Sequence, residues 1–448
     1  MSSEWPLKKI SEIADFLNSK RIPLKSLDRQ KRQGPYPYYG ASGIVDRIDG
    51  YIFDGTYLLI SEDGENLRTR KTPIAFKAHG KFWVNNHAHI LSEKEEGVLD
   101  YLEYYFSTLD LDPYITGAVQ PKINKANLDS IEIPFPDKDT RLFINATLNS
   151  LTQKVAINHK LNQTLEQMAQ ALFKSWFVNF EPVKAKIAVL DAGGSQEDAT
   201  LAAMTAISGK DADALVVFER EHPEQYAELK ATAELFPSAM QDSELGEIPE
   251  GWRHGPLSNI ATFANGKVDV CSLTPETYIS TENMLENRAG ISTASSLPSA
   301  NSVPEFRCGH VLISNIRPYF KKIWLARFNG GRSADVLAFK ALDAVTIEYL
   351  YNLLYQETFF NFMMLTSKGV KMPRGDKKSI MGWQCVHPDK KISNVFSKAV
   401  GEHYSFIEIN NAQNKTLTQL RDTLLPKLLS GEITLPEAEQ AISEVENV

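Results

Sequence analysis

The side chains of this chain that could do chemistry are mainly cations on loops, interleaved with aromatic residues and glycine. They cluster as KRIPLKSLDRQKRQGPYPYY at residues 20–39, RTRK at 68–71, RPYFKK at 317–322 and KMPRGDKK at 371–378. Lysine and arginine on loops clamp phosphates and, beside polar and aromatic groups, read base edges. Each group alone is more typical of a solvated charged surface, but their presence in both halves of the chain favours contact with DNA. The candidate contacts are Arg32, Tyr38, Tyr39, Arg68, Arg70, Lys122, Arg317, Lys321, Lys322, Arg374 and Lys377.

Catalytic motifs are missing from the sequence. There is no Walker lysine loop, no G-x-G-x-x-G after an expected strand, no GxSxG and no HExxH. Asp112-Pro113-Tyr114 lacks the second proline of the N/D-P-P-Y active site of amino-methyltransferases. PDK at 136 and PDKK at 388 resemble part of a nuclease motif, but no second acid and lysine follow at the required spacing. We therefore expect no catalytic residue in this chain.

Histidine and cysteine are the candidate metal ligands. His87 and His89 alternate along an expected strand, near His79, and could reach one ion. However, no carboxylate stands at a recognisable spacing, and the second half has no counterpart. The three cysteines, at 271, 308 and 385, are far apart, and no CxxC occurs. We expect packing or hydrogen bonding from the histidines, and neither a metal nor a cofactor bound by this chain.

The net charge of −8 argues against a nucleic-acid partner only if the charge is spread evenly. Residues 181–250 carry 15 acidic and 5 basic side chains, so the net charge of this segment is −10 and that of the rest of the chain is +2.

A length of 448 residues suggests two or three domains. No apolar run approaches the ~18 residues that span a bilayer, and the start shows no signal-peptide pattern. We therefore expect a cytoplasmic protein without membrane contact.

Residues 141–180 form the element that must position the basic loops. They contain neither proline nor glycine, and seam-like side chains recur at steps of three and four, the period of a coiled-coil helix. The pattern returns 252 residues later. The expected seam comprises Leu151, Val155, Asn158, Asn162, Leu165, Ile407, Asn410, Asn414 and Leu417, and the first stripe extends to Leu148, Met168, Leu172 and Trp176.

Two asparagines lie on each seam, Asn158 and Asn162 in the first and Asn410 and Asn414 in the second. A buried amide needs a matched partner, so we expect these residues to fix the register of the helices. The alternative is that they lie at the solvated edge of the stripe. Pro426 is expected to kink or end the second helix around Leu425, with Gly431 as its C-terminal stop.

The globular segments before the two helices also repeat. WPLKKISEIADF at residues 5–16, expected as a short amphipathic helix, matches WRHGPLSNIATF at 252–263, and GAVQP at 117–121 matches GVKMP at 369–373. The middles differ, with YPYYGASG in the first and YISTENM in the second, and both mix helix and strand patterns. The pattern predicts one scaffold that carries two unlike recognition surfaces.

The repeats and composition shifts set the expected boundaries. The first domain covers residues 1–140, the first long helix 141–182, and an acidic Ala/Glu-rich linker with helical pieces 183–248. The second domain covers 249–392, the second long helix 393–432 and a C-terminal tail 433–448.

Taken in this order, the motifs resemble the specificity subunits of type I restriction–modification systems over almost the whole chain. The resemblance rests on YPYYGASGIVD, KFWVNNHAHIL and LNQTLEQMAQALFKSWFVNFEPVKAK in the first half, and on SELGEIPEGW, VLISNIRPYFKKIW and NKTLTQLRDTLLPKLLSGEI in the second. It implies an α+β fold in which two mixed α/β target recognition domains are separated by two long antiparallel coiled-coil helices, related by an internal pseudo-two-fold repeat.

The resemblance also implies a function and partners. Each domain would read one half of a bipartite, asymmetric target in double-stranded DNA, and helices of ~40 residues, ~60 Å long, would set the separation. Two modification subunits would carry S-adenosylmethionine and methylate adenine, and restriction subunits would use ATP and Mg²⁺. The linker has no counterpart after the second helix, so the repeat is imperfect. The alternatives are a stand-alone DNA-cleaving enzyme with an unrecognised active site and a non-specific assembly scaffold.

Overall fold

The computed structural model describes residues 5–117, 120–244 and 246–433. The chain forms two compact units. Unit 1 contains the residues up to His159 and those from Asn411 onward, and unit 2 is Lys160–Asn410. The two long helices, α6 (Lys138–Phe177) and α14 (Lys390–Leu429), each contribute one segment to each unit. The C-terminal tail expected from 433 onward lies, except for its first residue, outside the described residues.

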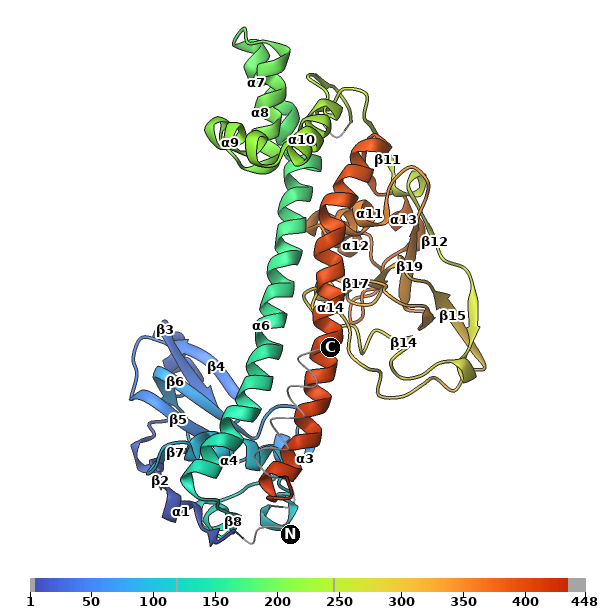
Figure 1. The fold of residues 1–448 in the computed structure, drawn as a ribbon. Coiled ribbons are helices and arrows are strands. Elements are labelled where there is room, and N and C mark those ends of the chain that lie inside the picture. Colours follow the sequence, from blue (N-terminus) through green and yellow to red (C-terminus); the bar gives the residue numbers. More distant parts are fainter. Residues whose placement is uncertain (1–4, 118–119, 245, 434–448) are drawn as a thin grey trace. The chain divides into compact units, whose positions relative to one another are not determined.

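Unit 1 is built on a six-stranded sheet with the order β2-β7-β5-β6-β3-β4 (Figure 1). Its neighbours pair antiparallel, except β3 and β6, which are parallel. Because side chains alternate along a strand, Leu58 packs on one face beneath helix α4 and Leu59 packs on the other against Phe82. The bounds are β2 Ala14–Phe16, β3 Gln33–Gly40, β4 Gly43–Ile48, β5 Phe53–Ser61, β6 Ala75–Val84, β7 Ala88–Glu93 and α4 Val98–Thr108.

Short elements complete unit 1, and they correct one expectation. Residues 5–16 do not form one helix: Leu7–Lys8 (β1) and Ala14–Phe16 (β2) are strands around a single turn, α1 (Ile10–Ile13). The pairing of β1 with β8 (Ile133–Pro134), and of β2 with β7, outweighs the helical period of the sequence. The others are η1 Asn18–Lys20, α2 Ser26–Gln30, α3 Asn66–Thr69, η2 Asp112–Tyr114 and α5 Lys125–Asp129.

Unit 2 contains two four-stranded sheets, ordered β12-β19-β16-β17 and β13-β15-β18-β14. The first sheet consists of β12 Ala261–Phe263, β16 Val311–Ser314, β17 Ile323–Leu325 and β19 Val336–Ala341. The second consists of β13 Lys267–Asp269, β14 Tyr278–Ile279, β15 Ser302–Phe306 and β18 Gly330–Arg332. The remaining elements around the sheets are β9 Met240–Gln241, β10 Ile248–Pro249, β11 Arg253–Pro256, η3 Leu257–Asn259, η4 Val270–Ser272, η5 Pro318–Phe320, α11 Ile347–Leu354, α12 Glu357–Leu365, α13 Lys377–Met381 and β20 Gln384–His387.

The internal repeat predicted from the sequence is visible in the topology. The order β2-β7-β5-β6 of unit 1 recurs as β12-β19-β16-β17 in unit 2, and the pair β1–β8 recurs as β11–β20. Helices α5 and α13, and likewise α6 and α14, begin and end 252 residues apart. The two units differ outside these shared strands. Strands β3 and β4 extend the sheet in unit 1, whereas unit 2 has a separate second sheet.

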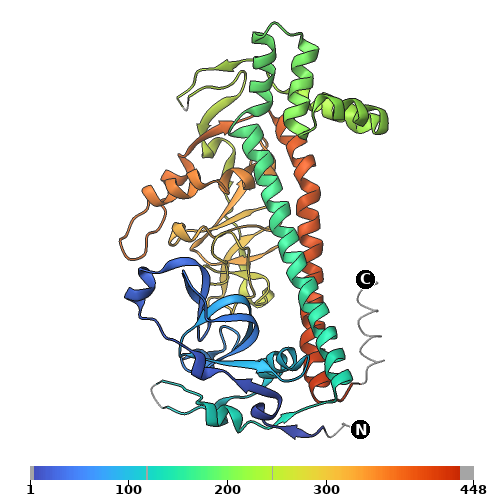
Figure 2. The ribbon, with the colours of Figure 1, turned by 90° about the vertical axis from the view of Figure 1, so that its left-hand side faces the viewer.

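The acidic linker folds into a four-helix group within unit 2, shown in green in Figure 2. The sequence explains the starts and stops: Ser195 and Asp198 form a capping box before α8, and Gly209, with φ of 68°, ends that helix. Ala203, Met204, Leu215 and Ala233 form a small core of their own. The helices are α7 Glu181–Asp191, α8 Gln196–Ser208, α9 Ala212–Glu221 and α10 Pro223–Leu235.

Helices α6 and α14 pack antiparallel within each unit, as the resemblance implies. In unit 1, Asn158 Nδ2 donates to Asn414 Oδ1 at 2.9 Å, and in unit 2, Asn410 Nδ2 donates to Asn162 Oδ1 at 2.8 Å. These two pairs are related by the 252-residue offset. The prediction that the seam asparagines find matched amide partners is confirmed, and Asn158 is only 4% exposed.

The expected seam needs corrections at two places. Met168 is half exposed, and Ala169 is buried instead, because a strict alternation of steps of three and four puts the seam at 169 after Leu165. The second helix does not end at Leu425 but continues through Pro426 to Leu429. Leu428 and Leu429 are buried in the core of unit 1, and Ser430 N–H donates to the Pro426 carbonyl at 3.0 Å. The predicted stop at Gly431 agrees with its φ of 70°.

Changing Asn414 alone to leucine is expected to destabilise unit 1 by about 1–3 kcal/mol. Asn158 donates one amide proton to Gln413 and the other to Asn414, so the change leaves a buried donor without an acceptor. Changing both Asn158 and Asn414 to leucine is expected to restore stability to the original level or above. Urea unfolding of the two single variants and the double variant measures this coupling, with exposed Lys415→Leu as the control. A double variant no more stable than Asn414→Leu would contradict it.

Within unit 2 the seam of α6 continues into a polar cluster against α11. Gln170 Nε2 donates to Asn352 Oδ1 at 2.6 Å, and Asn352 Nδ2 donates to the Tyr404 hydroxyl at 2.8 Å. One turn before Gln170 stands Glu166. Burial raises the pKa of the Glu166 carboxyl to about 7, against opposing effects of Tyr351 and Arg327. The cluster therefore buries a carboxyl whose charge state changes near neutral pH.

The stability of unit 2 is expected to fall between pH 5 and pH 8 relative to the variant Glu166→Gln. Between the ordinary pKa of 4.5 and about 7, folded protein holds a proton on Glu166 that the unfolded chain releases. The stabilisation is thus fully present below pH 4.5 and is lost as the pH rises through 7, by up to about 3 kcal/mol. Urea unfolding at several pH values measures the difference, and parallel curves for the two proteins would contradict the assignment.

Candidate nucleic-acid interface

Two loops that are closed by the same backbone pairing, one in each unit, carry basic residues among the candidate DNA contacts. In unit 2, Lys368 and Arg374 exchange two backbone hydrogen bonds of 2.9 Å, which closes the second-domain hairpin (residues 368–374). In unit 1, Thr116 and Lys122 exchange two bonds of 2.8 Å and close the first-domain hairpin (residues 116–122). Glycine follows the first closing residue in both, with φ of 96° and 90°, a conformation that other residues rarely adopt. The GAVQP and GVKMP repeats are therefore enclosed by equivalent pairs of backbone hydrogen bonds.

Each hairpin docks on the segment that follows the central strand of its sheet. In unit 1, Gly64 N–H donates to the Pro121 carbonyl at 3.0 Å, just after β5. In unit 2, Arg317 N–H donates to the Pro373 carbonyl at 2.8 Å, just after β16. Asn315 reinforces the second junction, because its side-chain amide donates to the Gly375 carbonyl at 3.1 Å. Each unit thus brings two loops, distant in sequence, side by side.

In unit 2 this junction gathers the two basic groups that the sequence suggested. Arg374 pairs with Asp335 at 2.9 Å, and Lys321 pairs with Glu357 at 2.8 Å. Lys322 Nζ donates to the Thr281 carbonyl at 2.8 Å. In the part of the chain that the structure describes, the exposed side chains of Arg317 and Lys377 have no ionic or hydrogen-bonding partner. The junction therefore presents cations that are available to an anionic ligand.

The loop that carries Arg317 and Lys321 is held in a costly conformation. Both residues have positive φ, 49° and 51°, on either side of η5. Such a conformation costs a non-glycine residue about 1–2 kcal/mol. Backbone hydrogen bonds fix it: Asn287 N–H donates to the Phe320 carbonyl at 2.8 Å, and Arg288 N–H donates to the Lys321 carbonyl at 3.0 Å. Strain of this kind is typical of functional loops.

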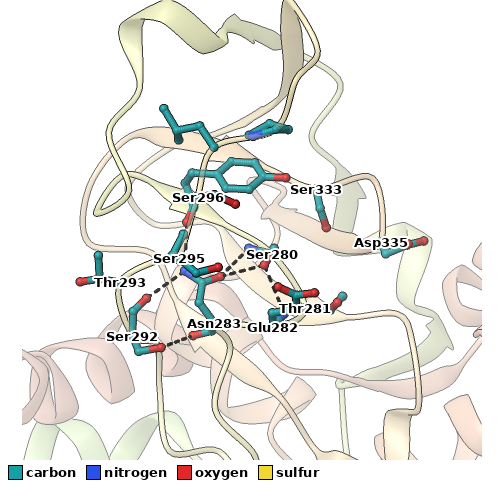
Figure 3. Close-up of a pocket in the computed structure, with 14 residues that line it drawn as sticks. Ser280, Thr281, Glu282, Asn283, Ser292, Thr293, Ser295, Ser296, Ser333 and Asp335 are labelled. Carbon is teal, nitrogen blue, oxygen red and sulfur yellow. Dashed lines mark hydrogen bonds between the residues drawn. The ribbon is translucent and has the colours of Figure 1, made fainter. Parts of the chain in front are cut away.

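Unit 2 also contains a polar cavity of about 410 Å³ (Figure 3). Asn283 shapes it: its side-chain amide donates to the carbonyls of Tyr278 and Ser292 at 3.0 and 2.8 Å, and its oxygen accepts from Ser280 N–H at 2.6 Å. Thr281 and Asp335 of the lining are the partners of Lys322 and Arg374. The lining is Tyr278, Ser280, Thr281, Glu282, Asn283, Ser292, Thr293, Ala294, Ser295, Ser296, Leu297, Pro298, Ser333 and Asp335. Sequence reasoning missed this cavity, although YISTENM is an unusually polar run.

In unit 1 the hairpin meets a carboxylate. Lys122 Nζ lies 3.2 Å from Glu62, which also accepts from Arg21 at 2.6 Å. Burial alone would raise the pKa of Glu62, but the hydrogen bond from Arg21 and the neighbouring cations hold it below its ordinary value. Arg68 is exposed on α3. Lys122 and Arg68 therefore remain as accessible cations of unit 1.

Arg70 has a structural task in addition to its charge. Its φ is 47°, and its guanidinium donates to the carbonyls of Ser107 at 3.2 Å, Phe106 at 3.4 Å and Leu109, at the C-terminal end of α4. Carbonyls at a helix end lack partners within the helix, and a cation there is favourable. The side chain is thus engaged in capping α4.

The aromatic group of unit 1 is less accessible than its sequence suggests. Tyr38 is 1% exposed, its hydroxyl accepts from Leu24 N–H at 2.9 Å, and Arg29 lies over its ring. The expectation of a direct contact by Tyr38 is corrected, because strand β3 turns this ring into the core. Tyr39 is half buried against Phe76 and Phe82.

Arg32 and the histidines have partners within unit 1. Arg32 pairs with Asp49 at 2.9 Å and lies over the Trp83 ring. His89 is buried, and burial lowers its pKa. Its Nδ1 accepts from the Asn18 side-chain amide at 2.8 Å, and its Nε2 donates to the Ile123 carbonyl at 2.8 Å. His87 contacts Asp63 at 2.8 Å. Across the described residues, no group of three His, Cys, Asp or Glu side chains could hold a metal ion.

The comparisons with known proteins now decide the family. Residues 2–167 match the family model described as "Type I restriction modification DNA specificity domain". Over 337 residues the chain is 30% identical to the type I restriction enzyme HindI specificity subunit of Haemophilus influenzae, covering 70% of this chain and 71% of that protein. The chain belongs to the type I restriction enzyme specificity subunits.

Further relatives extend the match over nearly the whole of this chain. The EcoDI specificity subunit of Escherichia coli is 20% identical over 450 residues, covering 96% of this chain and 89% of that protein. The crystal structure of a type I restriction–modification system S subunit from M. genitalium matches the fold with a TM-score of 0.52 at 14% identity, covering 95% of this chain and 96% of that one. The family predicted from the motifs is confirmed, and none of these relatives supports a stand-alone nuclease.

Proposed function

We propose that the two globular domains of this specificity subunit each read one half of a bipartite target in double-stranded DNA. The observation that carries the proposal is the repeated junction of hairpin and strand-end loop, which displays cations in both units. Repeated phosphate clamps position a protein on DNA, while variable side chains beside them supply sequence preference. The same frame used twice is what recognition of two half-sites requires.

The target is proposed to be asymmetric, because the surroundings of the two hairpins differ. Unit 1 has the strands β3 and β4, whereas unit 2 has a second sheet and the polar cavity. At equivalent positions of the hairpins stand Gln120 and Met372. Glutamine is suited to adenine and methionine to apolar groups. Because the side chains beside the two hairpins differ, the two halves of the DNA target are proposed to differ in sequence.

We further propose that the chain is the non-catalytic member of its complex. Two modification subunits would dock on it and carry S-adenosylmethionine for adenine methylation, and restriction subunits would use ATP and Mg²⁺. We also propose a cytoplasmic location for the complex, on the ground of family membership. Across the described residues, no helix is long and apolar enough to cross a membrane. Support for these partners comes from membership of the family of type I specificity subunits.

Mapping of methylated adenine in genomic DNA tests the proposal. Cells that express this chain with its modification subunits are expected to methylate a motif of two unlike halves, and cells without this chain are expected to lose that methylation. A continuous or palindromic motif, or methylation that persists without the chain, would contradict the proposal. Purified chain with Mg²⁺ is expected to leave DNA intact, whereas cleavage abolished by a point substitution would revive the nuclease alternative.

A further inference from the structure

The tip of the second-domain hairpin (residues 368–374) exposes apolar side chains to an unusual degree. Val370 is fully exposed, at 101% of its reference area, and Met372 is 54% exposed. Leu365, at the end of α12, is 84% exposed. Single exposed apolar residues are common, but a group of three within eight residues is typical of a binding surface. The exposed apolar side chains therefore indicate that the tip is covered by a binding partner.

Cations surround this apolar tip. Lys371 lies between Val370 and Met372 in the sequence and is exposed, and Arg374 closes the hairpin with a side chain that is 55% exposed. Lys368 is paired with Asp376 at 3.1 Å, yet its side chain is 82% exposed. A partner that fits this surface must be anionic at its rim and apolar at its centre. Duplex DNA has this distribution of charge, with phosphates at the groove edges and the thymine methyl groups on the groove floor.

The hairpin is fixed at its base, so that the tip is presented in a defined place. The backbone bonds between Lys368 and Arg374, and the bond from Arg317 N–H to the Pro373 carbonyl, hold both sides of the loop. Gly375 N–H also donates to the Asn315 carbonyl at 3.2 Å. A narrow two-sided loop fits the major groove, which admits a two-stranded ribbon. A rigid base reduces the entropy lost when the tip is buried.

We propose that the hairpin enters the major groove and packs Val370 and Met372 against thymine methyl groups of the half-site read by unit 2, while Lys371 and Arg374 bind the flanking phosphates. This inference rests on the proposed function and adds the chemical feature that is read. The inference also predicts that the half-site contains at least one thymine whose methyl group is required for full binding affinity.

The test uses the complete methyltransferase complex and a duplex that carries its mapped motif. Deoxyuridine in place of thymine removes only the methyl group, and each contacted methyl is expected to contribute about 4-fold in affinity. The variant Val370→Ser/Met372→Ser is expected to bind the thymine duplex about 10-fold more weakly than the unaltered protein. Its affinity is expected to be the same for the deoxyuridine duplex as for the thymine duplex. The matched control is Val216→Ser, a substitution at a 68% exposed valine of α9, which is expected to behave like the unaltered protein.

The outcomes separate this inference from the proposed function. A half-site without thymine, or an unaltered complex indifferent to deoxyuridine, would overturn the thymine contact. Normal binding by Val370→Ser/Met372→Ser, together with weaker binding by Lys371→Gln/Arg374→Gln, would also overturn the thymine contact. In that case the proposed function would remain supported. If Lys371→Gln/Arg374→Gln also leaves affinity and motif unchanged, the assignment of DNA reading to this junction fails as well. Unstacking of 2-aminopurine beside the half-site would indicate a wedge between bases and would overturn the groove contact.

Discussion

The triple variant Arg317→Gln/Arg374→Gln/Lys377→Gln is expected to bind target DNA on the order of 100-fold more weakly at 0.15 M salt. Each cation that neutralises a phosphate contributes about 0.9 to the slope of log affinity against log salt. Removal of three such contacts therefore lowers the slope by about 2.7. The loss also leaves Asp335, the partner of Arg374, as an uncompensated anion at the interface.

Fluorescence anisotropy of the complex on a duplex containing the motif, between 0.05 and 0.3 M salt, measures both quantities. The control replaces two exposed lysines of the four-helix group, Lys184→Gln/Lys230→Gln, which changes net charge without touching the hairpin junction. An unchanged salt slope in the triple variant, or an equal change in the control, would show that these cations do not contact phosphate.

The variant Phe396→Ala is expected to destabilise unit 2 by about 3–5 kcal/mol. Phe396 is 0% exposed on α14, and its ring contacts those of Phe173, Trp176 and Phe177 on α6. Truncation of a buried phenylalanine removes its transfer free energy and leaves a cavity. Because this cluster lies where the two helices meet in unit 2, the loss also loosens the scaffold beneath the second domain.

Urea unfolding followed by tryptophan fluorescence gives the change in free energy. Phe406→Ala is the matched control, since Phe406 stands on the same helix but is 55% exposed, and its truncation is expected to change stability by less than about 0.5 kcal/mol. Equal effects of the two substitutions would mean that the aromatic cluster does not hold the helices together.

The long helices were the most predictable part of the fold. A period of three and four over forty residues, repeated with the same asparagines, specifies both the helices and their pairing, and the observed helices begin three residues before the expected start. The error at Met168 arose because an apolar residue beside the seam is indistinguishable from one on it unless the strict heptad is followed. Pro426 does not end the helix, because burial of Leu428 and Leu429 stabilises the turn that follows it.

The candidate interface was predicted only in outline. The basic groups around Arg317 and Arg374 were recognised, but their meeting depends on the backbone bond from Arg317 to Pro373, 56 residues away, which no local pattern encodes. Composition also cannot tell an exposed tyrosine from a buried one, and the prediction that Tyr38 contacts DNA directly is therefore wrong. The sequence does not indicate the exposed apolar tip at Val370, because an apolar residue in a loop has the same sequence pattern whether it is buried or exposed.

Exchange of the first domain tests most directly the central claim that sequence recognition resides in the two globular domains. Residues 5–137 are replaced by the corresponding domain of the H. influenzae relative, and both long helices and unit 2 are kept. Methylated adenine is then mapped in cells that supply the modification subunits. We expect one half of the methylated motif to change and the other half to remain. A motif that stays unchanged in both halves would contradict the account.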